Sequence, residues 1–471
     1  MKWKQQSEKI SEVVHHHSVQ ILEKVGFCVP DPETLARLMA AGFLVNEETS
    51  MVRIPEELIR PALETLPKNV TLYNRDRTKA LDFHSRTSFM GAGTPVNVVD
   101  LQTGERRSAT RQDVRRFVTL QDALPEVDIV RPTVTATDIG EASDLVEIAE
   151  LLRFTNKPIV HRTLAPERVP DAVEMLAAVA GGEQEMRDKP NFATVYCPIS
   201  PGYFTKENIQ CMLRWAEFGV PITLLSMAMG GASAPATLLG EMVVINLEIL
   251  AWIVFLQHLY PRTPLLYGSV SSVLDMRTGI LPLGAPERGM INSGAAIMGA
   301  FYGIPSMCGG LSTDAKDLDL QAGYEKALTA FPLLMEDASI IYGVGAVDAG
   351  AAISYLQMVM DNEMIGGLRR MMQGISLHDL TEEIALIEAN IPRGNFLKDK
   401  HTRSHYKHHW QPKILNREAY ETWISHKQDI KSLSQAKALD LLATHQPVQL
   451  SADVESEIER ILRKHIASAV M

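Results

Sequence analysis

The sequence predicts an α/β fold, a (β/α)8 barrel with a helical extension at its N-terminus and a helical tail at its C-terminus. Short apolar runs that stop at glycines, such as residues 304–310 and 338–347, indicate strands buried on both faces. A segment of helical length follows each run, and consecutive strand–helix units imply parallel pairing with right-handed crossovers. The unit recurs eight times between residues 88 and 372, a span that suits one closed barrel.

The eight candidate strands are residues 88–93, 127–136, 158–163, 192–199, 221–227, 264–269, 305–309 and 339–343. The helical segments that follow them are residues 110–123, 142–155, 169–180, 206–218, 236–259, 287–302, 318–335 and 349–372. A doubly wound open sheet is the competing architecture. The even spacing of the units and the lack of a G-x-G-x-x-G motif after the first strand favour closure into a barrel.

The segments before and after the barrel lack its regular strand–helix repeat. Residues 1–80 carry no strand-rich pattern, and Asp31 is placed to cap one of their helices. Three helices are expected there, at residues 7–25, 31–41 and 55–66. After about Gly374 the strand–helix periodicity weakens, and the chain ends in an amphipathic helix over residues 452–466. The expected division is an N-terminal helical extension at 1–85, the barrel at 86–374, and a C-terminal extension at 375–471 that packs on the barrel.

Composition excludes several classes of protein. The 471 residues carry a formal net charge of -11 with a pI near 5.7, which argues against nucleic acid as the main partner. The four cysteines are far apart and form no C-x-x-C pair, so we expect reduced thiols in a cytoplasmic protein. The N-terminus lacks a secretory h-region.

The most apolar window, residues 242–256, is too short to span a bilayer and is interrupted by Asn246 and Glu248. We therefore expect a buried helix there and no membrane association. The large apolar helices also permit a homo-oligomer.

Histidines gather in two places, and neither predicts a metal site. His15, His16 and His17 are consecutive, so they point around a helix and cannot converge on one ion. The histidines between residues 398 and 413 alternate with lysine and arginine, and no carboxylate or cysteine completes a ligand set. A solvated or partner-facing surface is the better interpretation.

In a barrel of this kind the active site lies at the C-terminal ends of the strands. Tyr196, Tyr267 and Tyr342 fall at the ends of strands four, six and eight, and Phe89 lies in strand one. Aromatic faces around one pocket suit a quaternary ammonium, at roughly 0.5–2 kcal/mol per ring. The alternative is that each tyrosine is a core residue with a satisfied hydroxyl. Glycines at several strand ends suggest an open top, or else ordinary loop geometry.

The strand ends lack the groups that self-sufficient catalysis needs. No G-x-S-x-G motif, strand lysine or paired histidines with a carboxylate occur there, which disfavours an aldolase-like lyase. Asp138, Asp314 and Asp348 are the carboxylates near predicted strand ends. A mouth with aromatic walls, few acids and much glycine fits a site where a cofactor supplies the reactivity.

Several separated motifs resemble one family. They are Gly-Gly-Ala-Ser-Ala-Pro-Ala-Thr at 230–237, Gly-Gly-Leu-Ser-Thr-Asp-Ala-Lys at 309–316 with Gln-Ala-Gly-Tyr-Glu at 321–325, Asp-Ala-Gly at 348–350 with Ser-Tyr at 354–355 and Asp-Asn-Glu at 361–363, His-Ser-Val-Gln-Ile-Leu-Glu-Lys-Val-Gly at 17–26, and Gly-Asn-Phe-Leu at 394–397 with His-Thr at 401–402. Together these motifs resemble the trimethylamine:corrinoid methyltransferase family over nearly the whole chain. The resemblance implies a barrel that presents a methylamine to a cobalamin carried by a separate corrinoid protein.

One departure from the family narrows the expected substrate. Archaeal trimethylamine enzymes carry pyrrolysine near the end of strand seven, whereas Leu311–Asp314 and their neighbours are standard residues. The chain is thus similar to the non-pyrrolysine relatives, which demethylate quaternary amines such as glycine betaine, proline betaine and carnitine. A quaternary nitrogen has a permanent charge and a tertiary amine as leaving group, so it needs no covalent activation.

The expected function is therefore transfer of a methyl group from a quaternary amine, glycine betaine first, to Co(I) of a corrinoid protein, with release of the tertiary amine. The alternatives are the same chemistry on proline betaine, carnitine or another betaine, or a betaine-binding barrel without turnover. No residue is singled out for the chemical step itself. The substrate-site candidates are the cage of Tyr196, Tyr267, Tyr342 and Phe89, the acids Asp138 and Asp314, and His161 or Arg162 for a carboxylate. The candidates for corrinoid contact are Gly230, Gly231, Gly309 and Gly310, with Ser233 expected to cap the helix after strand five.

Overall fold

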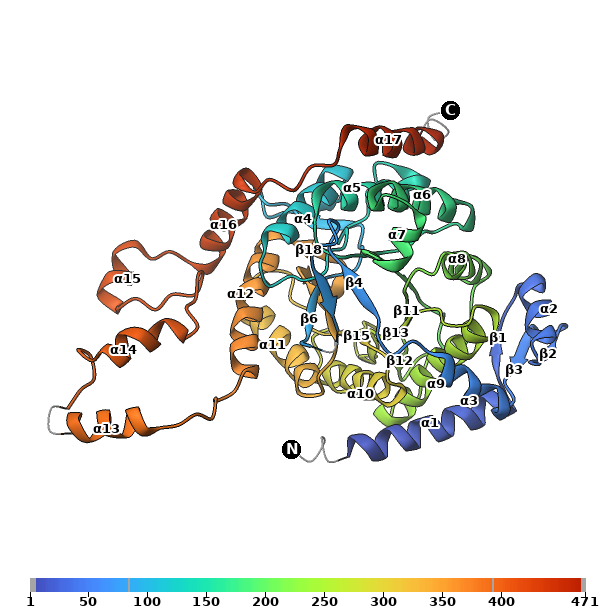
Figure 1. The fold of residues 1–471 in the computed structure, drawn as a ribbon, viewed down its shortest axis with the longest axis horizontal. Helices are drawn as coiled ribbons and strands as arrows, with labels where there is room; N and C mark the ends of the chain where they lie inside the picture. The colour runs from blue at the N-terminus through green and yellow to red at the C-terminus, as the bar shows by residue number, and fades with distance from the viewer. Residues whose placement is uncertain (1–5, 84, 392–393, 467–471) are drawn as a thin grey trace.

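A parallel barrel forms the centre of the computed structural model, which describes residues 6–83, 85–391 and 394–466 (Figure 1). Seven strands are hydrogen bonded in the order β6-β16-β15-β13-β11-β10-β9. Their bounds are β6 Ser88–Gly91, β9 Ile159–His161, β10 Phe192–Tyr196, β11 Ile222–Ser226, β13 Leu265–Ser269, β15 Ser306–Gly309 and β16 Ile340–Val344. Each strand pair is parallel, as the strand–helix repeat predicts.

The sheet closes through a short eighth segment. Ile129 forms a parallel bridge with Met90 of β6, and Val130 forms one with Ile159 of β9. The strand expected at residues 127–136 is thus reduced to two bridging residues. Pro132 lacks an amide proton and Thr133 has a φ of 60°, so the ladder cannot continue. The eight crossings still complete the predicted (β/α)8 barrel.

Helices cover the outside of the barrel. They are α4 Arg111–Ala123, α5 Ser143–Phe154, α6 Val169–Ala180, α7 Glu183–Asp188, α8 Lys206–Glu217, α9 Leu238–Leu259, α10 Pro286–Tyr302, α11 Leu320–Met335 and α12 Tyr355–Met372. Most match the expected segments within one or two residues. The last begins six residues later than expected, because Asp348, Ala349 and Gly350 adopt positive φ and turn the chain before α12.

Helix α9 is long and apolar enough to cross a membrane by length and composition. It lies instead inside the protein, packed against α1, α3 and α10 and against strand β11. Its polar side chains Asn246 and Glu248 are fully buried and hydrogen bonded within the chain. The expected buried helix is confirmed, and α9 is a core helix.

The N-terminal segment contains strands that the sequence pattern did not reveal. Alongside α1 Ser7–Lys24, α2 Pro32–Ala40 and α3 Glu56–Thr65 it forms β1 Phe27–Cys28, β2 Leu44–Asn46, β3 Met51–Arg53, β4 Thr71–Tyr73 and β5 Ala80–Asp82. Asp31 caps α2 as expected, accepting from Thr34 N. Leu72 and Phe83 pack into the cluster that fills the barrel, so the β4–β5 hairpin plugs its N-terminal end.

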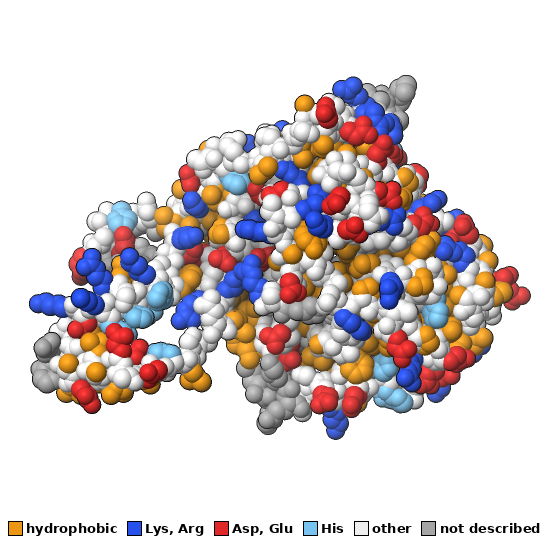
Figure 2. Space-filling model, viewed as in Figure 1, with side chains coloured by type: hydrophobic (Ala, Val, Ile, Leu, Met, Phe, Trp, Pro, Cys, Tyr) orange, Lys and Arg blue, Asp and Glu red, His pale blue; other side chains and the backbone are white. Residues whose placement is uncertain are grey.

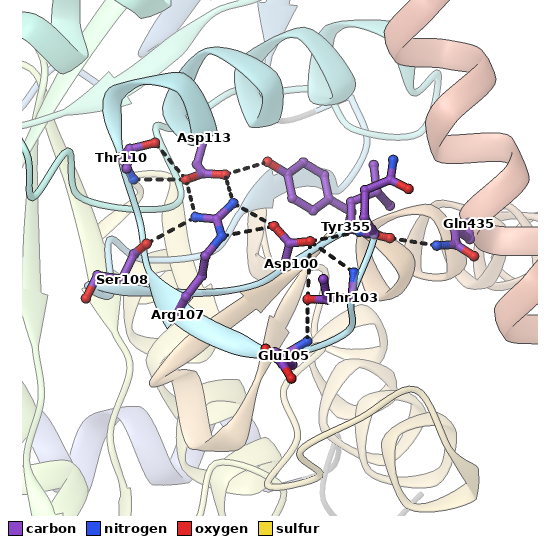
Figure 3. Close-up of polar contacts among 11 residues, drawn as sticks. Asp100, Thr103, Glu105, Arg107, Ser108, Thr110, Asp113, Tyr355 and Gln435 are labelled. Atoms are coloured by element: carbon purple, nitrogen blue, oxygen red, sulfur yellow. Dashed lines mark hydrogen bonds and ion pairs between the residues drawn. The ribbon is translucent and has the colours of Figure 1, made fainter.

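A small second sheet, of order β17-β18-β7-β8, lies beside the C-terminal ends of β6 and β16. Its strands are β7 Asn97–Val99, β8 Arg106–Ser108, β17 Ala346–Val347 and β18 Ala352–Ser354. Figure 3 shows how it is fixed: Arg107 binds Asp113 through two nitrogens and also binds Asp100. Tyr355, which stacks on Phe117 with centroids 3.9 Å apart, donates to Asp113. A shorter pair, β12 Met229–Gly230 and β14 Ser272–Val273, lies above β11 and β13.

The C-terminal extension has two parts. Helices α13 Thr381–Asn390, α14 Lys400–His405 and α15 Tyr420–His426 project away from the barrel (Figure 1). The chain then returns, and α16 Ile430–Thr444 packs on α12 and α4 while α17 Ala452–Ile466 packs on α6 and α5. The expected amphipathic helix at 452–466 therefore exists. The second part of the extension rests on the barrel, as do Lys413, Ile414 and Leu415, whose amides donate to Glu363 of α12.

Candidate active site

The alternation of side chains along each strand decides which residues enter the barrel. One set fills the interior together with the N-terminal plug: Met90, Ile129, Val160, Ala193, Val195, Leu225, Leu266, Met307 and Ile340, with Cys197 and Tyr342 at its edge. Their neighbours in sequence belong to the separate layer between strands and helices. Because successive side chains face opposite sides of a strand, a residue two positions beyond an interior residue also faces inward.

Tyr342 is the aromatic residue of the predicted cage that the structure places at the mouth. It pairs with Gly309 on one side and Met90 on the other, and its ring is half-buried. A β-carbon at Gly93 would lie 2.4 Å from the Tyr342 hydroxyl, so this glycine makes room for it. The ring therefore stands at the C-terminal end of the barrel, where chemistry is expected.

Arg131 lies against this ring, with its Cζ 5.2 Å from the ring centroid. The side chain is buried, and within the described residues its guanidinium has no hydrogen bond or ion pair. Burial lowers the pKa of Arg131, and the nearby charge of Arg162 lowers it further, while Tyr342 opposes both effects. A buried cation with unused donors is costly unless a ligand completes its hydrogen bonding.

Arg162 is the second unpaired cation at the mouth. It follows β9, two positions after the interior residue Val160, so it faces inward. It is half-buried, and among the described residues it too has no hydrogen bond or ion pair. It acts electrostatically on Arg131 and on the Cys197 thiol. Two guanidinium groups that repel each other are both stabilised by an anion bound near them.

Arg288 reaches the same end of the barrel from α10. Its Nη1 donates to the Val270 carbonyl at 2.6 Å, and its Nε has no partner among the described residues. A β-carbon at Gly309 would lie 2.4 Å from Nη2, so the guanidinium lies directly over that glycine. Burial lowers the pKa of Arg288 to about 10, although Tyr342 and Asp314 act to raise it. Arg288 therefore adds a third positive charge near Tyr342.

Two carboxylates close to this end of the barrel, Glu147 and Glu248, are engaged elsewhere. Glu147 accepts from Ala136 N and lies 2.8 Å from His161 Nε2. Glu248 accepts from the hydroxyls of Ser226 and Ser200 and from Gly202 N. With these acids satisfied, the positive charge of Arg131 and Arg162 is left to act on a ligand. Positive charge without a partner among the described residues, beside one aromatic ring, makes this a candidate anion site.

The other three aromatic candidates do not reach the mouth. Tyr196 is buried in the outer layer, where it accepts from Trp215 Nε1 at 3.1 Å and donates to the Thr163 carbonyl at 3.1 Å. Tyr267 donates to Asn246 and lies parallel to Tyr302. Phe89 is buried under Arg369. The strand pairing places Tyr196 and Tyr267 on the side of the sheet that faces the helices, whereas Tyr342 faces the barrel interior. The expected four-ring cage therefore does not form.

The polar candidates divide in the same way. Arg162 lies in the mouth, whereas its neighbour His161 faces the helices and pairs with Glu147. Asp138 is exposed and accepts from Arg111 N at the start of α4. Asp314 accepts from Leu283 N, and burial raises its pKa. Asp348 forms an ion pair with Arg106.

At most of the candidate glycines, the space beside the backbone is already occupied by other atoms of the protein. Arg288 covers Gly309, and Leu333 lies 2.3 Å from the position of a β-carbon at Gly310. Glu241 Oε2 lies 2.4 Å from that position at Gly230. Ser233 does not cap α9, whose first residue is Leu238; its hydroxyl accepts from Met229 N within a tight turn. This turn, which includes Gly231 at a φ of 91°, stays partly exposed at the rim.

Exposed apolar side chains surround the mouth. Each one follows a barrel strand and belongs to the loop at its C-terminal end: Val96, Leu164, Ile199, Met227, Met276 and Ile280. Exposed apolar side chains gathered on the loops at one end of a barrel are typical of an interaction surface. We refer to this set as the apolar rim.

Two important residues were absent from the sequence-based candidates. Arg131 follows the apolar run Ile129–Val130, and a charge in an otherwise buried strand was a usable signal. Arg288 lies on a helix one turn from its start, and nothing in the local pattern separates it from a surface arginine. Only the folded chain brings it to Gly309.

The fold and this site define a (β/α)8 barrel protein with a cationic, apolar-rimmed mouth, and comparison with known proteins gives its family. The family described as Trimethylamine methyltransferase (MTTB) matches residues 2–469. A trimethylamine methyltransferase MttB from Desulfitobacterium hafniense is 31% identical over 454 residues, covering 96% of this chain and 92% of the relative. One from Methanosarcina barkeri is 32% identical over 461 residues, covering 96% and 93%.

A glycine betaine methyltransferase from Desulfitobacterium hafniense is 28% identical over 455 residues, covering 95% of this chain and 94% of the relative. Among solved structures, the Methanosarcina barkeri monomethylamine methyltransferase has a TM-score of 0.48 at 12% identity, covering 95% and 94%. The chain belongs to the trimethylamine methyltransferase family, as its motifs predicted, and is a methyltransferase.

Proposed function

We propose that the protein transfers a methyl group from a carboxylate-bearing quaternary amine, with glycine betaine as the first candidate, to the corrinoid of a partner protein. The observation that supports this most strongly is the unpaired Arg131, stacked on Tyr342 and facing Arg162. A glycine betaine methyltransferase among the relatives is consistent with the same substrate class.

The charges at the mouth would orient such a substrate. Arg131 and Arg162 attract its carboxylate and repel its ammonium, so the carboxylate lies deep and the N-methyl groups face the apolar rim. A charge-assisted pair of this kind contributes about 1.5–3 kcal/mol. Tyr342 offers its ring to the methylated nitrogen, for about 0.5–2 kcal/mol. Trimethylamine, which is protonated near neutral pH and has no carboxylate, meets the same repulsion without the attraction that a carboxylate provides.

The apolar rim fits the partner. When bound, the corrinoid supplies the nucleophile that accepts the methyl group, and this chain's share is to hold and orient the amine and to exclude water. The exposed side chains of Met227, Met276 and Ile280 offer an apolar seat around the opening for a flat macrocycle. Among the predicted glycines, the turn with Gly231 and Ser233 remains available for corrinoid contact, whereas Gly309 and Gly310 serve internal packing.

The proposal includes where the protein works and how its parts divide the task. All four cysteines are unpaired, which suits a reducing cytoplasm. We assign substrate and corrinoid contact to the barrel at residues 86–374. The β4–β5 hairpin of the segment at 1–85 closes the N-terminal end of the barrel, and helices α16 and α17 of the segment at 375–471 pack on its outer helices.

The test is a methyl-transfer assay with Co(I) cobalamin or a corrinoid protein, in which loss of the Co(I) absorbance is followed. Glycine betaine, proline betaine and carnitine carry both a carboxylate and a quaternary nitrogen; choline lacks the carboxylate, and trimethylamine lacks both. We expect turnover with at least one betaine and little with choline or trimethylamine. Turnover with choline or trimethylamine equal to that with every betaine would overturn the proposed substrate class.

A further inference from the structure

The ring of Tyr342 is not held in place by its own hydroxyl. Among the described residues that hydroxyl forms no hydrogen bond, although the half-buried ring lies at the mouth, with Gly309 on one neighbouring strand and Met90 on the other. The position of an aromatic side chain without a hydrogen bond is set by the atoms packed around it. The surroundings of this ring therefore decide where its face points.

Gly93 packs directly against the end of this ring. It lies just after β6, and a β-carbon at Gly93 would be 2.4 Å from the Tyr342 hydroxyl oxygen and 3.6 Å from Cζ. Apart from the two chain neighbours of Gly93, no other atom of the described residues lies within 4 Å of that β-carbon position. The first distance is well inside van der Waals contact and the second is an ordinary contact. An added methyl group would therefore collide with the hydroxyl oxygen alone.

The backbone at Gly93 is fixed from both sides and does not yield easily to such a collision. Ala92 N donates to the Val344 carbonyl at 3.0 Å, which ties the chain to the end of β16. Thr135 donates through its hydroxyl and its amide to the carbonyls of the two residues after Gly93, both at 3.0 Å. The φ of Gly93 lies outside the left-handed region, so alanine fits its backbone conformation. With alanine at this position, the ring of Tyr342 is the part that moves.

Arg131 confines the ring from a second direction. Its guanidinium carbon lies over the ring, 5.2 Å from the centroid, and its side chain is buried. On the face of the protein drawn in Figure 2, basic and acidic side chains lie side by side over the barrel, whereas the guanidinium of Arg131 has no ion pair among the described residues. This unpaired charge thus lies inside the mouth, next to the ring. Ring and cation keep their spacing only while Gly93 leaves the ring where it is.

From this packing we propose that Gly93 is a positioning residue that acts through Tyr342. The space left by its missing side chain holds the ring against Arg131, where the ring can meet the methylated nitrogen of the substrate. What concerns the substrate rests on the proposed function, whereas what concerns the ring does not. A cation is attracted to an aromatic face only within about 6 Å of the ring centroid. A displacement of about 1 Å can cost about 100-fold in rate, so a small movement of the ring is enough to be measured.

The experiment compares Gly93→Ala, Tyr342→Phe and the variant that combines both. Gly93→Ala adds the methyl group that meets the hydroxyl, and we expect KM for glycine betaine to rise by about tenfold, with a smaller change in kcat. In the combined variant the colliding oxygen is absent, and the nearest ring atom lies 3.6 Å from the new β-carbon. Its KM should therefore return to within about threefold of the wild-type value, because the two substitutions compensate each other.

Crystal structures of the same variants without substrate give a readout that does not depend on turnover. The ring should be displaced in Gly93→Ala and should return in the combined variant. The matched control is Gly367→Ala in α12, which adds the same methyl group where the nearest side-chain atoms, those of Trp410, lie 3.8 Å away. This control should keep the wild-type KM and the wild-type position of the Tyr342 ring.

Two results would overturn the inference. One is a Gly93→Ala protein that keeps the wild-type KM or whose ring stays in place. The other is a combined variant as impaired as Gly93→Ala, because the alanine would then act through the backbone and not through the hydroxyl. If the wild type itself turns over no betaine, the proposed substrate class fails instead. The crystal structures then decide by themselves whether Gly93 sets the position of the ring.

Discussion

The Arg131 guanidinium carbon lies 5.2 Å from the centroid of the Tyr342 ring, and both residues come from barrel strands that lie on either side of β6. The guanidinium of this buried arginine has no hydrogen bond within the part of the chain that the structure describes, so its donors are available to an anion. Arg162 faces the same space from the next strand. The predictions below test what each of these groups contributes.

Arg162→Gln should weaken binding of a betaine without altering the fold. The side chain has no hydrogen bond to lose among the described residues, and a charge-assisted bond to substrate contributes about 1.5–3 kcal/mol. We expect KM for glycine betaine to rise by about 10- to 100-fold, with a smaller change in kcat. Arg214→Gln on the outer face of α8 is the control and should keep the wild-type KM.

The contribution of Tyr342 to substrate binding can be tested with one variant that lacks only the hydroxyl and another that lacks the whole ring. Tyr342→Phe keeps the aromatic face and should retain KM within about threefold, whereas Tyr342→Leu removes it and should raise KM by about tenfold, in line with 0.5–2 kcal/mol for a ring against a quaternary nitrogen. Steady-state kinetics of both variants with the same betaine give the comparison. Equal effects of the two substitutions would show that the ring face does not contact the substrate.

Tyr196→Phe should affect stability and leave KM unchanged. The hydroxyl donates to the Thr163 carbonyl and accepts from Trp215 Nε1. Its loss leaves that buried carbonyl without a hydrogen bond among the described residues, whereas Trp215 Nε1 still donates to Thr163 Oγ1. We expect the free energy of unfolding to fall by about 1–3 kcal/mol. Chemical denaturation measures this loss. A large rise in KM for Tyr196→Phe would contradict this account and indicate that Tyr196 contacts the substrate.

The tyrosines show most clearly which features of the site the sequence can predict and which it cannot. The apolar runs predicted the barrel strands because they are buried on both faces, but that same burial removes the hydrophobic–polar alternation that would tell which side chains face inward. Tyr196 and Tyr342 look equivalent in the sequence, but the strand pairing shows that their side chains face opposite sides of the sheet. The side chains that reach the mouth could therefore be identified only from the structure.

Other differences have local causes. Strands β1 and β4 have only two or three residues, too few for any periodicity to show. Strand two is cut short by Pro132 and the positive φ of Thr133. Arg162 was identified from its place at a strand end, whereas Arg288 needed the contact with Gly309 that only tertiary packing creates.

A buried ion pair holds the ends of strands seven and eight. Lys326 Nζ lies 2.8 Å from Asp361 Oδ2 and donates to the Leu311 carbonyl, while Asp361 accepts from Gly345 N. Both side chains are fully buried, so Lys326→Met leaves an uncompensated carboxylate and should lower the free energy of unfolding by about 3–5 kcal/mol. Adding Asp361→Leu should recover part of that loss. A double variant as unstable as the single one would contradict this account.

Glu241 should make stability depend on pH. Burial raises its pKa from 4.5 to about 8, so the folded chain holds a proton that the unfolded chain releases. A raised carboxyl pKa contributes stability in full below pH 4.5 and loses it as pH rises to about 8. Between pH 5.5 and 8 the free energy of unfolding should therefore fall more for the wild type than for Glu241→Gln. Denaturant titrations at the two pH values, with Glu167→Gln on the exposed surface as control, measure this difference; parallel pH profiles would contradict it.

The measurement that tests the central claim most directly is calorimetric titration of the purified chain with glycine betaine and with choline, which differ in the carboxylate. The account predicts that glycine betaine binds at least about tenfold more tightly to the wild type, and that this preference disappears in Arg131→Gln combined with Arg162→Gln. Choline binding as tightly as glycine betaine, or a preference that survives both substitutions, would contradict the assignment of the arginine mouth to a substrate carboxylate.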